Sequence, residues 1–421
     1  MTTPPDNPAL DALNGLSVGD ALGAQFFVPA TAAAHLADRT DPPGPWPWTD
    51  DTEMACSVYA AVTERGTVDP ADLTLAFALR HDFDRGYGPA ANRMLRLVRE
   101  GGDARALAAA LFDGRGSYGN GAAMRVAPLG AALADDLDEV VRLAARTAVT
   151  THTHPQAVDG AVAVAVAAAV AVRARAGTMT PNGFLAKVRH HTPSGAVHDG
   201  LAEAAALLAE PDPLAAARVL GNGSRTSAAD TVPYALWCAA RRLTDYRAAV
   251  REAVAPGGDM DTVAAITGGV VAAHTGTRGI PAAWLAAREP LPAWAFPRPG
   301  SVTGGRGRAA MLVPRPQAVP DVLWTEEQWQ RIRTGGDPAA LDHRWAVHTA
   351  GGAVRICDSR SGHPIWEVAV TLVRGGRRPV SAVVEAGHNR WLALPGERHA
   401  PALLAWILRT AATGEREAFR P

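Results

Sequence analysis

Two short acidic motifs lie far apart in the chain, Thr49-Asp50-Asp51 and Asp259-Met260-Asp261-Thr262. Together they supply four carboxylates and two hydroxyls, an all-oxygen set of the kind that a hard divalent cation such as Mg²⁺ prefers. Each motif comes just before a helical run, where acidic and hydroxyl residues are also ordinary helix caps. Taken singly, each motif is therefore typical of a helix start.

Considered together, the two motifs contain more acid than two helix caps require. Clustered carboxylates repel one another unless a cation neutralises them or some of them bind protons. We therefore expect the fold to bring the motifs together around magnesium. A pair of ions is the preferred version, since two ions that share carboxylates typically lie about 3.5–4 Å apart. The expected metal ligands are Thr49, Asp50, Asp51, Asp259, Asp261 and Thr262.

Two glycine-rich segments could bind an anion. Residues 114–121 lead into Ala122-Ala123-Met124-Arg125. A glycine-rich loop that opens a helix presents backbone N–H groups to a phosphate, and Ser117 and Asn120 would add side-chain donors. A plain turn is the alternative. The second segment is Arg85-Gly86-Tyr87-Gly88, in which Tyr87 could stack on a base or ribose.

Histidines occur in Thr151-His152-Thr153-His154-Pro155, just before an Ala/Val-rich run. No HExxH pattern or paired cysteines accompany them, which argues against zinc. For both His152 and His154 the alternative to a functional role is a hydrogen-bonded core histidine.

Composition limits the class of protein. The 421 residues carry 41 Lys+Arg against 42 Asp+Glu, a formal charge of −1, which argues against a nucleic-acid partner. Cys56, Cys238 and Cys357 are far apart and lack CxxC spacing, which fits a reducing compartment. The N-terminus does not resemble a secretory signal, and the apolar run 161–172 is shorter than the roughly 20 residues that span a bilayer. We expect a cytoplasmic protein without a membrane partner.

From about residue 8 to residue 290, apolar runs at helical spacing alternate with short Gly/Pro/Asp breaks, which predicts a mostly α protein with an all-α bundle as its first domain. Functional sites in such a bundle would lie on loops and helix ends. The predicted helical runs are 52–63, 70–81, 89–100, 137–149, 156–174, 201–208, 232–243, 246–254 and 262–274.

Residues 291–322 are rich in proline and glycine and are predicted to be a linker. Residues 323–421 are predicted to form a small α+β domain that could recruit a protein partner. Thr325 and Gln328 form a capping box for a short helix. Strands are predicted over 345–348, 354–358, 365–373 and 380–386, with a helix over 401–412.

The order of motifs resembles the ADP-ribosylglycohydrolase family, the dinitrogenase-reductase-activating glycohydrolase group. The resemblance covers residues from about 13 to 276. Its matching pieces are Gly19-Asp20-Ala21-Leu22-Gly23, Thr49-Asp50-Asp51-Thr52, Gly119-Asn120-Gly121, Thr151-His152 and Gly258-Asp259-Met260-Asp261-Thr262. The glycine segments, with Gly221-Asn222-Gly223, look most like the branch that removes serine-linked and poly-ADP-ribose and cleaves O-acetyl-ADP-ribose.

The resemblance implies an all-α fold, two Mg²⁺ ions on the six residues of the acidic motifs, and hydrolysis of ADP-ribosylated substrates with release of ADP-ribose. The ions would polarise the distal ribose, and a carboxylate, Asp51 or Asp261, would take the proton of the attacking water. The candidate substrate-binding residues are Gly86, Tyr87, Gly88, Ser117, Tyr118, Gly119, Asn120, Gly121, Met124 and His152.

One position departs from the family. A glutamate usually stands four residues after Gly23, where this chain has Phe27. The branch that uses this glutamate as a mobile acid/base would lack it here. Either a metal-binding carboxylate does the proton transfer, or the chain is an ADP-ribose-binding module with little turnover. The sequence leaves open whether a serine, arginine or acetyl-ester linkage is cleaved.

Overall fold

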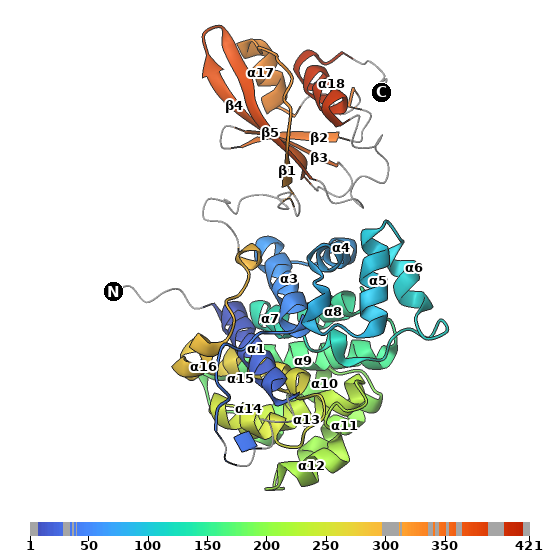
Figure 1. Cartoon of the computed structure of the whole chain (residues 1–421), viewed down its shortest axis with the longest axis vertical. Coiled ribbons are helices and arrows are strands. Elements are labelled where there is room, and N and C mark those ends of the chain that lie inside the picture. Colours follow the sequence, from blue (N-terminus) through green and yellow to red (C-terminus); the bar gives the residue numbers. More distant parts are fainter. Residues whose placement is uncertain are drawn as a thin grey trace. The chain divides into compact units, whose positions relative to one another are not determined.

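The Ala/Leu/Val-rich runs in the N-terminal part of the chain form helices, as their spacing predicts (Figure 1). A computed structural model describes residues 7–27, 34–35, 38, 40–296, 311, 314–335, 340–341, 345–350, 353–358, 364–385 and 400–415. The chain divides into two units near residue 301, and each unit has its own hydrophobic core. The first unit is all-α throughout its described residues, so the predicted fold class is confirmed.

The helical unit begins with α1 (Pro8–Ala24), which the short 3₁₀ turn Gln25–Phe27 extends. The helices that follow are α3 (Asp50–Arg65), α4 (Pro70–Arg80), α5 (Pro89–Arg99), α6 (Ala104–Ala110), α7 (Ala127–Ala132), α8 (Leu137–Ala148), α9 (Pro155–Arg173), α10 (Pro181–His191), α11 (Ala196–Ala206), α12 (Pro213–Leu220), α13 (Ala228–Arg241), α14 (Tyr246–Val254), α15 (Met260–Thr275) and α16 (Ala282–Ala287).

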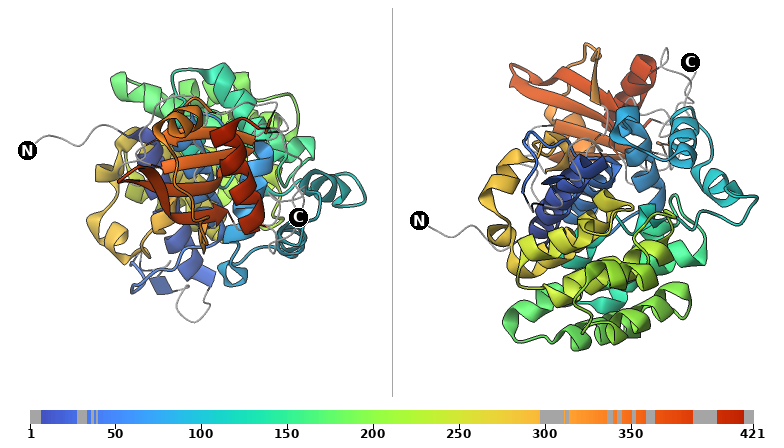
Figure 2. Two further views of the ribbon diagram at one scale, coloured as in Figure 1. Left: turned by 90° about the horizontal axis from the view of Figure 1, so that it is seen from above. Right: turned by 60° about the horizontal axis from the view of Figure 1, so that its bottom comes forward.

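Glycines bring α1 and α15 into close contact. Gly15, Gly19 and Gly23 recur every four residues and so lie on one face of α1. A Cβ at Gly19 would stand 2.1 Å from the Ala264 carbonyl oxygen, so no larger residue fits between the two backbones. The two helices run side by side in both sets of views (Figure 1, Figure 2). This pairing sets the distance between Asp20 on α1 and the acidic motif at the start of α15.

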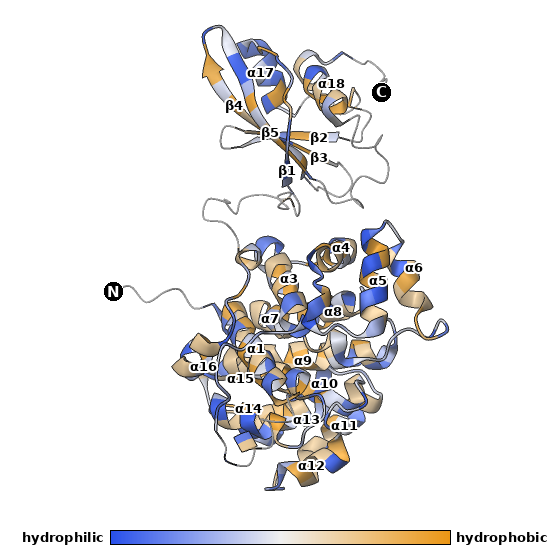
Figure 3. Cartoon of the chain, viewed as in Figure 1, coloured by the Kyte–Doolittle hydropathy of each residue, from blue (hydrophilic) through white to orange (hydrophobic). Residues whose placement is uncertain are grey.

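The apolar helix α9 packs against α7, α8, α10, α13 and α15 in the middle of the unit, while α5 carries a more hydrophilic surface (Figure 3). With the turn that follows it, α9 is long and apolar enough to cross a membrane by length and composition alone, over Pro155–Ala176. However, 83% of its most apolar window is buried. This is the pattern of a core helix, as the sequence predicts for residues 161–172.

The second unit is a five-stranded antiparallel sheet with two helices. The strand order is β1-β5-β4-β3-β2, and one hydrophobic cluster joins the sheet to the helices. Thr325 and Gln328 form the predicted capping box of α17. The elements are β1 (Pro314–Gln317), α17 (Glu326–Arg333), β2 (Trp345–Ala350), β3 (Ala353–Asp358), β4 (Pro364–Val373), β5 (Gly376–Glu385) and α18 (Ala400–Thr413).

Both described ends of the predicted 291–322 linker have regular structure, which corrects that boundary. Pro314–Gln317 form β1 and pair with β5. Proline has no backbone N–H to donate. It is tolerated in β1 because an edge strand pairs with a neighbouring strand on one side only. At the other end, Ala295 is buried and the Phe296 ring lies 6.0 Å from that of Tyr59 on α3. Residues 291–296 therefore belong to the helical unit.

Candidate active site

The two acidic motifs are in direct contact. The hydroxyl of Thr262, in the first turn of α15, donates to both carboxylate oxygens of Asp51, in the first turn of α3, at 3.0 and 3.1 Å. These residues are 211 positions apart in the chain. Asp51 and Thr262 are both buried, so their contact is an internal feature of the fold. Folding therefore joins the motifs, as the sequence analysis expects.

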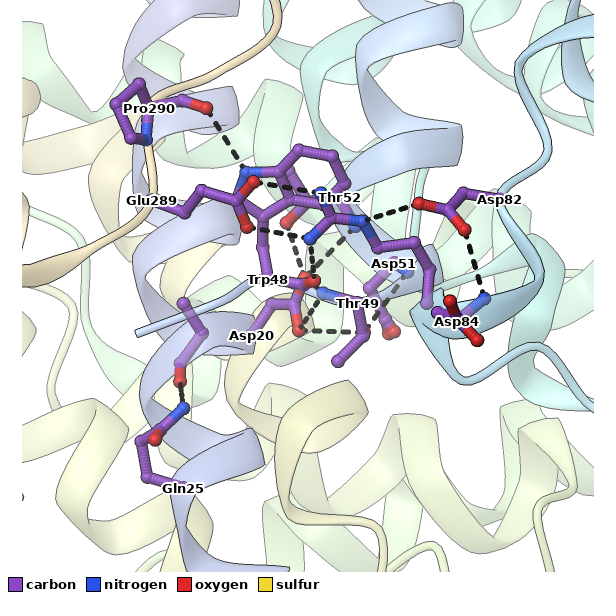
Figure 4. A network of polar contacts seen from close by, with 12 residues as sticks. Asp20, Gln25, Trp48, Thr49, Asp51, Thr52, Asp82, Asp84, Glu289 and Pro290 are labelled. Carbon is purple, nitrogen blue, oxygen red and sulfur yellow. Dashed lines mark hydrogen bonds and ion pairs between the residues drawn. The ribbon is translucent and has the colours of Figure 1, made fainter. Parts of the chain in front are cut away.

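Asp20 on α1 holds the first motif in place (Figure 4). Its carboxylate accepts hydrogen bonds from the backbone N–H and hydroxyl of Thr49, at 3.0 and 2.8 Å, and from the backbone N–H of Thr52 at 3.1 Å. The Thr52 hydroxyl also donates to it. In the sequence, Asp20 stands out only as part of the Gly19-to-Gly23 motif. Its role follows from the glycines on either side, which press α1 against α15 and leave Asp20 to face α3.

The cap interpretation of the motifs holds for one and fails for the other. Thr49 caps α3 with its side chain, which accepts from the Asp51 N–H at 3.4 Å. Asp259 stands at the cap position of α15 but makes no side-chain cap hydrogen bond. Asp245, by contrast, accepts from the Ala248 N–H at 3.0 Å and caps α14. The Asp259 carboxylate therefore does not serve as a helix cap.

Burial and mutual repulsion raise the pKa values of the clustered carboxyls. The pKa of Asp50 is raised to about 8, first by desolvation and then by the charge of Asp20. The pKa values of Asp51 and Asp261 are raised well above the usual range, again mainly by desolvation and next by the charges of Asp261 and Asp259 respectively. In the described part of the chain, none of the ion pairs includes these three residues. The carboxyl groups of Asp50, Asp51 and Asp261 thus have no cationic side chain paired with them in the described part of the chain.

This donor set suits a hard cation. Carboxylate and hydroxyl oxygens are the ligands that Mg²⁺ takes, and a divalent ion would relieve the repulsion that raises these pKa values. Among the described residues, no group of three His, Cys, Asp or Glu side chains has the spacing of a metal site.

The loop of residues 116–121, the Gly119 loop, is tied to the second acidic motif. The side-chain amide of Asn120 donates to Asp259 Oδ2 at 2.7 Å and to Thr231 Oγ1 at 3.0 Å. Both amide hydrogens are thereby used within the chain, and Asn120 orients Asp259. The role of the Asn120 side chain as a phosphate donor stays a prediction. The Gly119 N–H is likewise committed, to Ser117 Oγ at 3.2 Å.

His152 supports the same loop. Its Nδ1 lies 2.7 Å from the Thr151 hydroxyl, and a Cβ at Gly121 would stand 2.8 Å from the imidazole Cε1. Gly121 therefore has to be glycine because the ring occupies that space. Desolvation, followed by the charge of Arg125, lowers the pKa of His152 to about 3, so the imidazole is neutral at physiological pH. Met124, the next predicted contact, is buried below the loop.

Residues 82–88, the Gly86 loop, lie beside the first motif. A Cβ at Gly86 would be 3.8 Å from Asp50 Oδ1, whereas nothing lies within 4 Å of one at Gly88. Tyr87 is buried, and its hydroxyl donates to Glu53 Oε2 at 2.7 Å. In this conformation Tyr87 anchors the loop, and its stacking on a ligand stays a prediction. Tyr118, 42% exposed, is the candidate aromatic that remains accessible.

Phe27 ends the 3₁₀ turn that follows α1, and its side chain is 48% exposed. A phenyl ring carries no titratable proton. Any acid/base group must therefore come from another residue, and the clustered carboxyls with raised pKa values are the candidates next to the motifs.

Comparison with known proteins identifies the class. Residues 1–302 match the family model described as ADP-ribosylglycohydrolase, so the chain belongs to that family. The ADP-ribosylhydrolase ARH3 of Xenopus tropicalis is 28% identical over 274 residues, 58% of this chain and 77% of that protein. The ARH3 of Danio rerio is 29% identical over 322 residues, 66% of this chain and 85% of that protein. An uncharacterized protein of Archaeoglobus fulgidus is 32% identical over 291 residues, 64% and 88% of the two chains.

Family membership makes the chain a hydrolase of the glycosidase type that acts on ADP-ribosyl groups. The matched region ends at residue 302, near the division between the two units. The second unit therefore lies outside the family match.

The raised pKa values predict how stability depends on pH. Without divalent ions, the free energy of unfolding of the helical unit should fall as pH rises from about 4 to about 8. Asp20 and Asp50 have folded pKa values of about 6 and about 8, above the unfolded value near 3.9. Between these values the folded state holds more protons than the unfolded state, so their contribution is complete below about pH 4 and lost by about pH 8.

Urea unfolding at about pH 5 and about pH 8, with EDTA or with Mg²⁺, measures this dependence. Mg²⁺ should flatten it because a bound cation favours the ionised carboxylates. Equal slopes with and without the ion would contradict the role assigned to the cluster.

Proposed function

We propose that the chain is a Mg²⁺-dependent hydrolase that releases ADP-ribose from ADP-ribosylated protein or from O-acetyl-ADP-ribose. The observation that supports it most is the contact of Thr262 with Asp51, which joins the two acidic motifs in a buried site. The glycine loops near the motifs also support the proposal, since one lies beside Asp50 and the other donates a hydrogen bond to Asp259. An acidic cluster beside two glycine-rich loops would suit a diphosphate-linked sugar.

The residues that would hold magnesium, as one ion or a pair, are Thr49, Asp50, Asp51, Asp259, Asp261 and Thr262. When bound, the ion would polarise the hydroxyls of the distal ribose and favour the charge that develops as the bond at the anomeric carbon breaks.

Among the chain's own groups, we assign Asp261 the proton of the attacking water. Both oxygens of Asp51 already accept from Thr262. Asp261 accepts the Thr262 N–H through one oxygen, Oδ1, at 2.8 Å. The water oxygen bonds to the anomeric carbon as the bond to the leaving oxygen or nitrogen breaks. The water's proton passes to Asp261 and from Asp261 to the leaving atom, so that no net proton is gained or lost.

Calorimetry of Mg²⁺ binding tests the site. Asp50→Ala and Asp259→Ala should each weaken Mg²⁺ binding strongly, because each removes a charged ligand from opposite halves of the cluster. Asp245→Ala is the matched control: it removes a helix-capping aspartate with no place in the site and should leave Mg²⁺ affinity unchanged. If both cluster variants bind Mg²⁺ like the wild type, the proposed metal site is wrong.

A second candidate function is an ADP-ribose-binding module, favoured by Phe27 at the position of the usual glutamate. Such a protein would bind ADP-ribose without releasing product. Mg²⁺-dependent turnover of a serine-ADP-ribosyl peptide would exclude it.

We also propose a cytoplasmic location, supported by the absence of disulfides among the described residues, where all three cysteines are buried thiols. We further propose that the second unit binds a protein partner.

A further inference from the structure

We propose that Arg85 is a positioning residue that fixes the Thr49–Asp51 motif and the Gly86 loop in one geometry, acting through Trp48 and Glu289. This inference rests on the proposed function, because the geometry that it sets is that of the proposed metal and ADP-ribose sites.

Arg85 makes contacts with two distant parts of the chain. Its guanidinium donates to both carboxylate oxygens of Glu289, at 2.7 and 2.9 Å, and to the Trp48 carbonyl at 3.0 Å. It also lies over the Trp48 indole, 3.5 Å from the ring centroid. A planar guanidinium can satisfy a carboxylate, a carbonyl and an aromatic face at once, which an ammonium group cannot.

These partners are next to the site in the chain. Trp48 comes immediately before Thr49, the first expected ligand, and Gly86, which lies beside Asp50, immediately follows Arg85. A change in the position of the guanidinium would therefore move both segments. Arg85 itself makes no hydrogen bond or ion pair with a carboxylate of the acidic motifs among its described contacts, so its effect has to be indirect.

Glu289 is a fixed acceptor rather than a free surface acid. Its backbone N–H donates to the Trp46 carbonyl at 2.9 Å, and the Trp46 N–H donates to the Ala287 carbonyl at 2.7 Å. The Trp48 indole N–H reaches the Pro290 carbonyl at 3.4 Å. The segments 287–290 and 46–48 are thus held together by contacts that do not involve Arg85, and Arg85 adds a further bridge between them.

A second tether holds the other side of the Gly86 loop. Glu53, on α3, accepts from the Tyr87 hydroxyl at 2.7 Å and from the Asp82 N–H at 3.2 Å. The loop is therefore fixed to α3 through Glu53 and to the Trp48 segment through Arg85. Loss of Arg85 would leave the fold intact and one side of the loop free, which separates an effect on position from an effect on folding.

The test compares Arg85→Met, Arg85→Lys and Glu289→Gln with the wild-type chain. We expect Arg85→Met to weaken Mg²⁺ binding, measured by calorimetry, by about 10- to 100-fold, the usual effect of removing a residue that orients metal ligands. ADP-ribose affinity should fall with it. Arg85→Lys should show a smaller loss. The melting temperature should change little, since a partly exposed ion pair contributes little to stability.

Arg65→Met is the matched control. Arg65 pairs with Asp72 and has a side chain 22% exposed, against 19% for Arg85, but it lies at the far end of α3. The Arg65→Met variant should bind Mg²⁺ as the wild type does. The double variant Arg85→Met/Glu289→Gln should lose no more affinity than Arg85→Met alone, because both changes break the same bridge.

Two outcomes would overturn the inference: wild-type Mg²⁺ affinity in Arg85→Met, or additive losses in the double variant. If Arg85→Met does not fold, Glu289→Gln decides, since it keeps the stacking on Trp48 and removes the charge of the acceptor; unchanged affinity then refutes the inference. If the wild-type chain itself binds no Mg²⁺, the proposed function fails and this inference with it, a result distinct from a normal wild type with an unaffected variant.

Discussion

Replacement of Asp261 by alanine should lower kcat for release of ADP-ribose by about 10²- to 10⁴-fold, the usual contribution of a general base. The reason is that Asp261 accepts the Thr262 N–H through Oδ1 and that desolvation raises the pKa of its carboxyl. Release of ADP-ribose from a serine-ADP-ribosyl peptide at saturating Mg²⁺ is the measurement. Saturation matters because Asp261 is also an expected metal ligand.

Asp261→Asn keeps the shape of the side chain and should lose turnover to a similar extent, since an amide cannot take a proton from water. Asp245→Ala, the helix-cap control, should cost about 1 kcal/mol of stability and leave kcat unchanged. Wild-type kcat in Asp261→Asn would transfer the role of base to Asp51 or to a residue outside the site.

Gly19→Ala should reduce the free energy of unfolding of the helical unit by about 3 kcal/mol, at the upper end of the usual cost of overpacking. The added Cβ would lie 2.1 Å from the Ala264 carbonyl oxygen, where backbone rather than a flexible side chain must give way. Urea or thermal unfolding measures the loss. Because Asp20 is the next residue, Mg²⁺ affinity should fall as well.

Gly177→Ala provides the comparison. Nothing lies within 4 Å of a Cβ at Gly177, and its φ of −167° is ordinary extended backbone. Its effect should stay within about 0.5 kcal/mol. Equal stability of the two variants would show that α1 and α15 can separate without cost, against the view that their contact positions the site.

The helical architecture could be predicted because its signals are local. The predicted run 246–254 coincides with α14, and the predicted run 156–174 differs from α9 by one residue at each end. α10 and α12 are not among the predicted runs, although Thr180 and Asp212 cap them and a proline follows each cap. The edge strand Pro314–Gln317 could not be predicted, because its prolines argue against a strand and the strand that it pairs with lies about seventy residues further along the chain.

The site could be predicted only in part, because its geometry depends on contacts between residues that lie far apart in the chain. Carboxylates at two helix starts point to a shared ion, and the contact of Thr262 with Asp51 agrees with their meeting. Whether a polar side chain faces a ligand or another residue depends on long-range packing. Asn120 and Tyr87 have the chemistry of ligand-binding residues, yet Asp259 and Glu53 already occupy their donors.

The most direct test of the central claim is a release assay with and without Mg²⁺ on a panel of substrates that carry serine-linked, arginine-linked or acetyl-linked ADP-ribose. The account predicts that the wild-type chain releases ADP-ribose from at least one of them only when Mg²⁺ is present, and that Asp50→Ala and Asp259→Ala do not. Release that continues undiminished in EDTA, or in both variants, would contradict it.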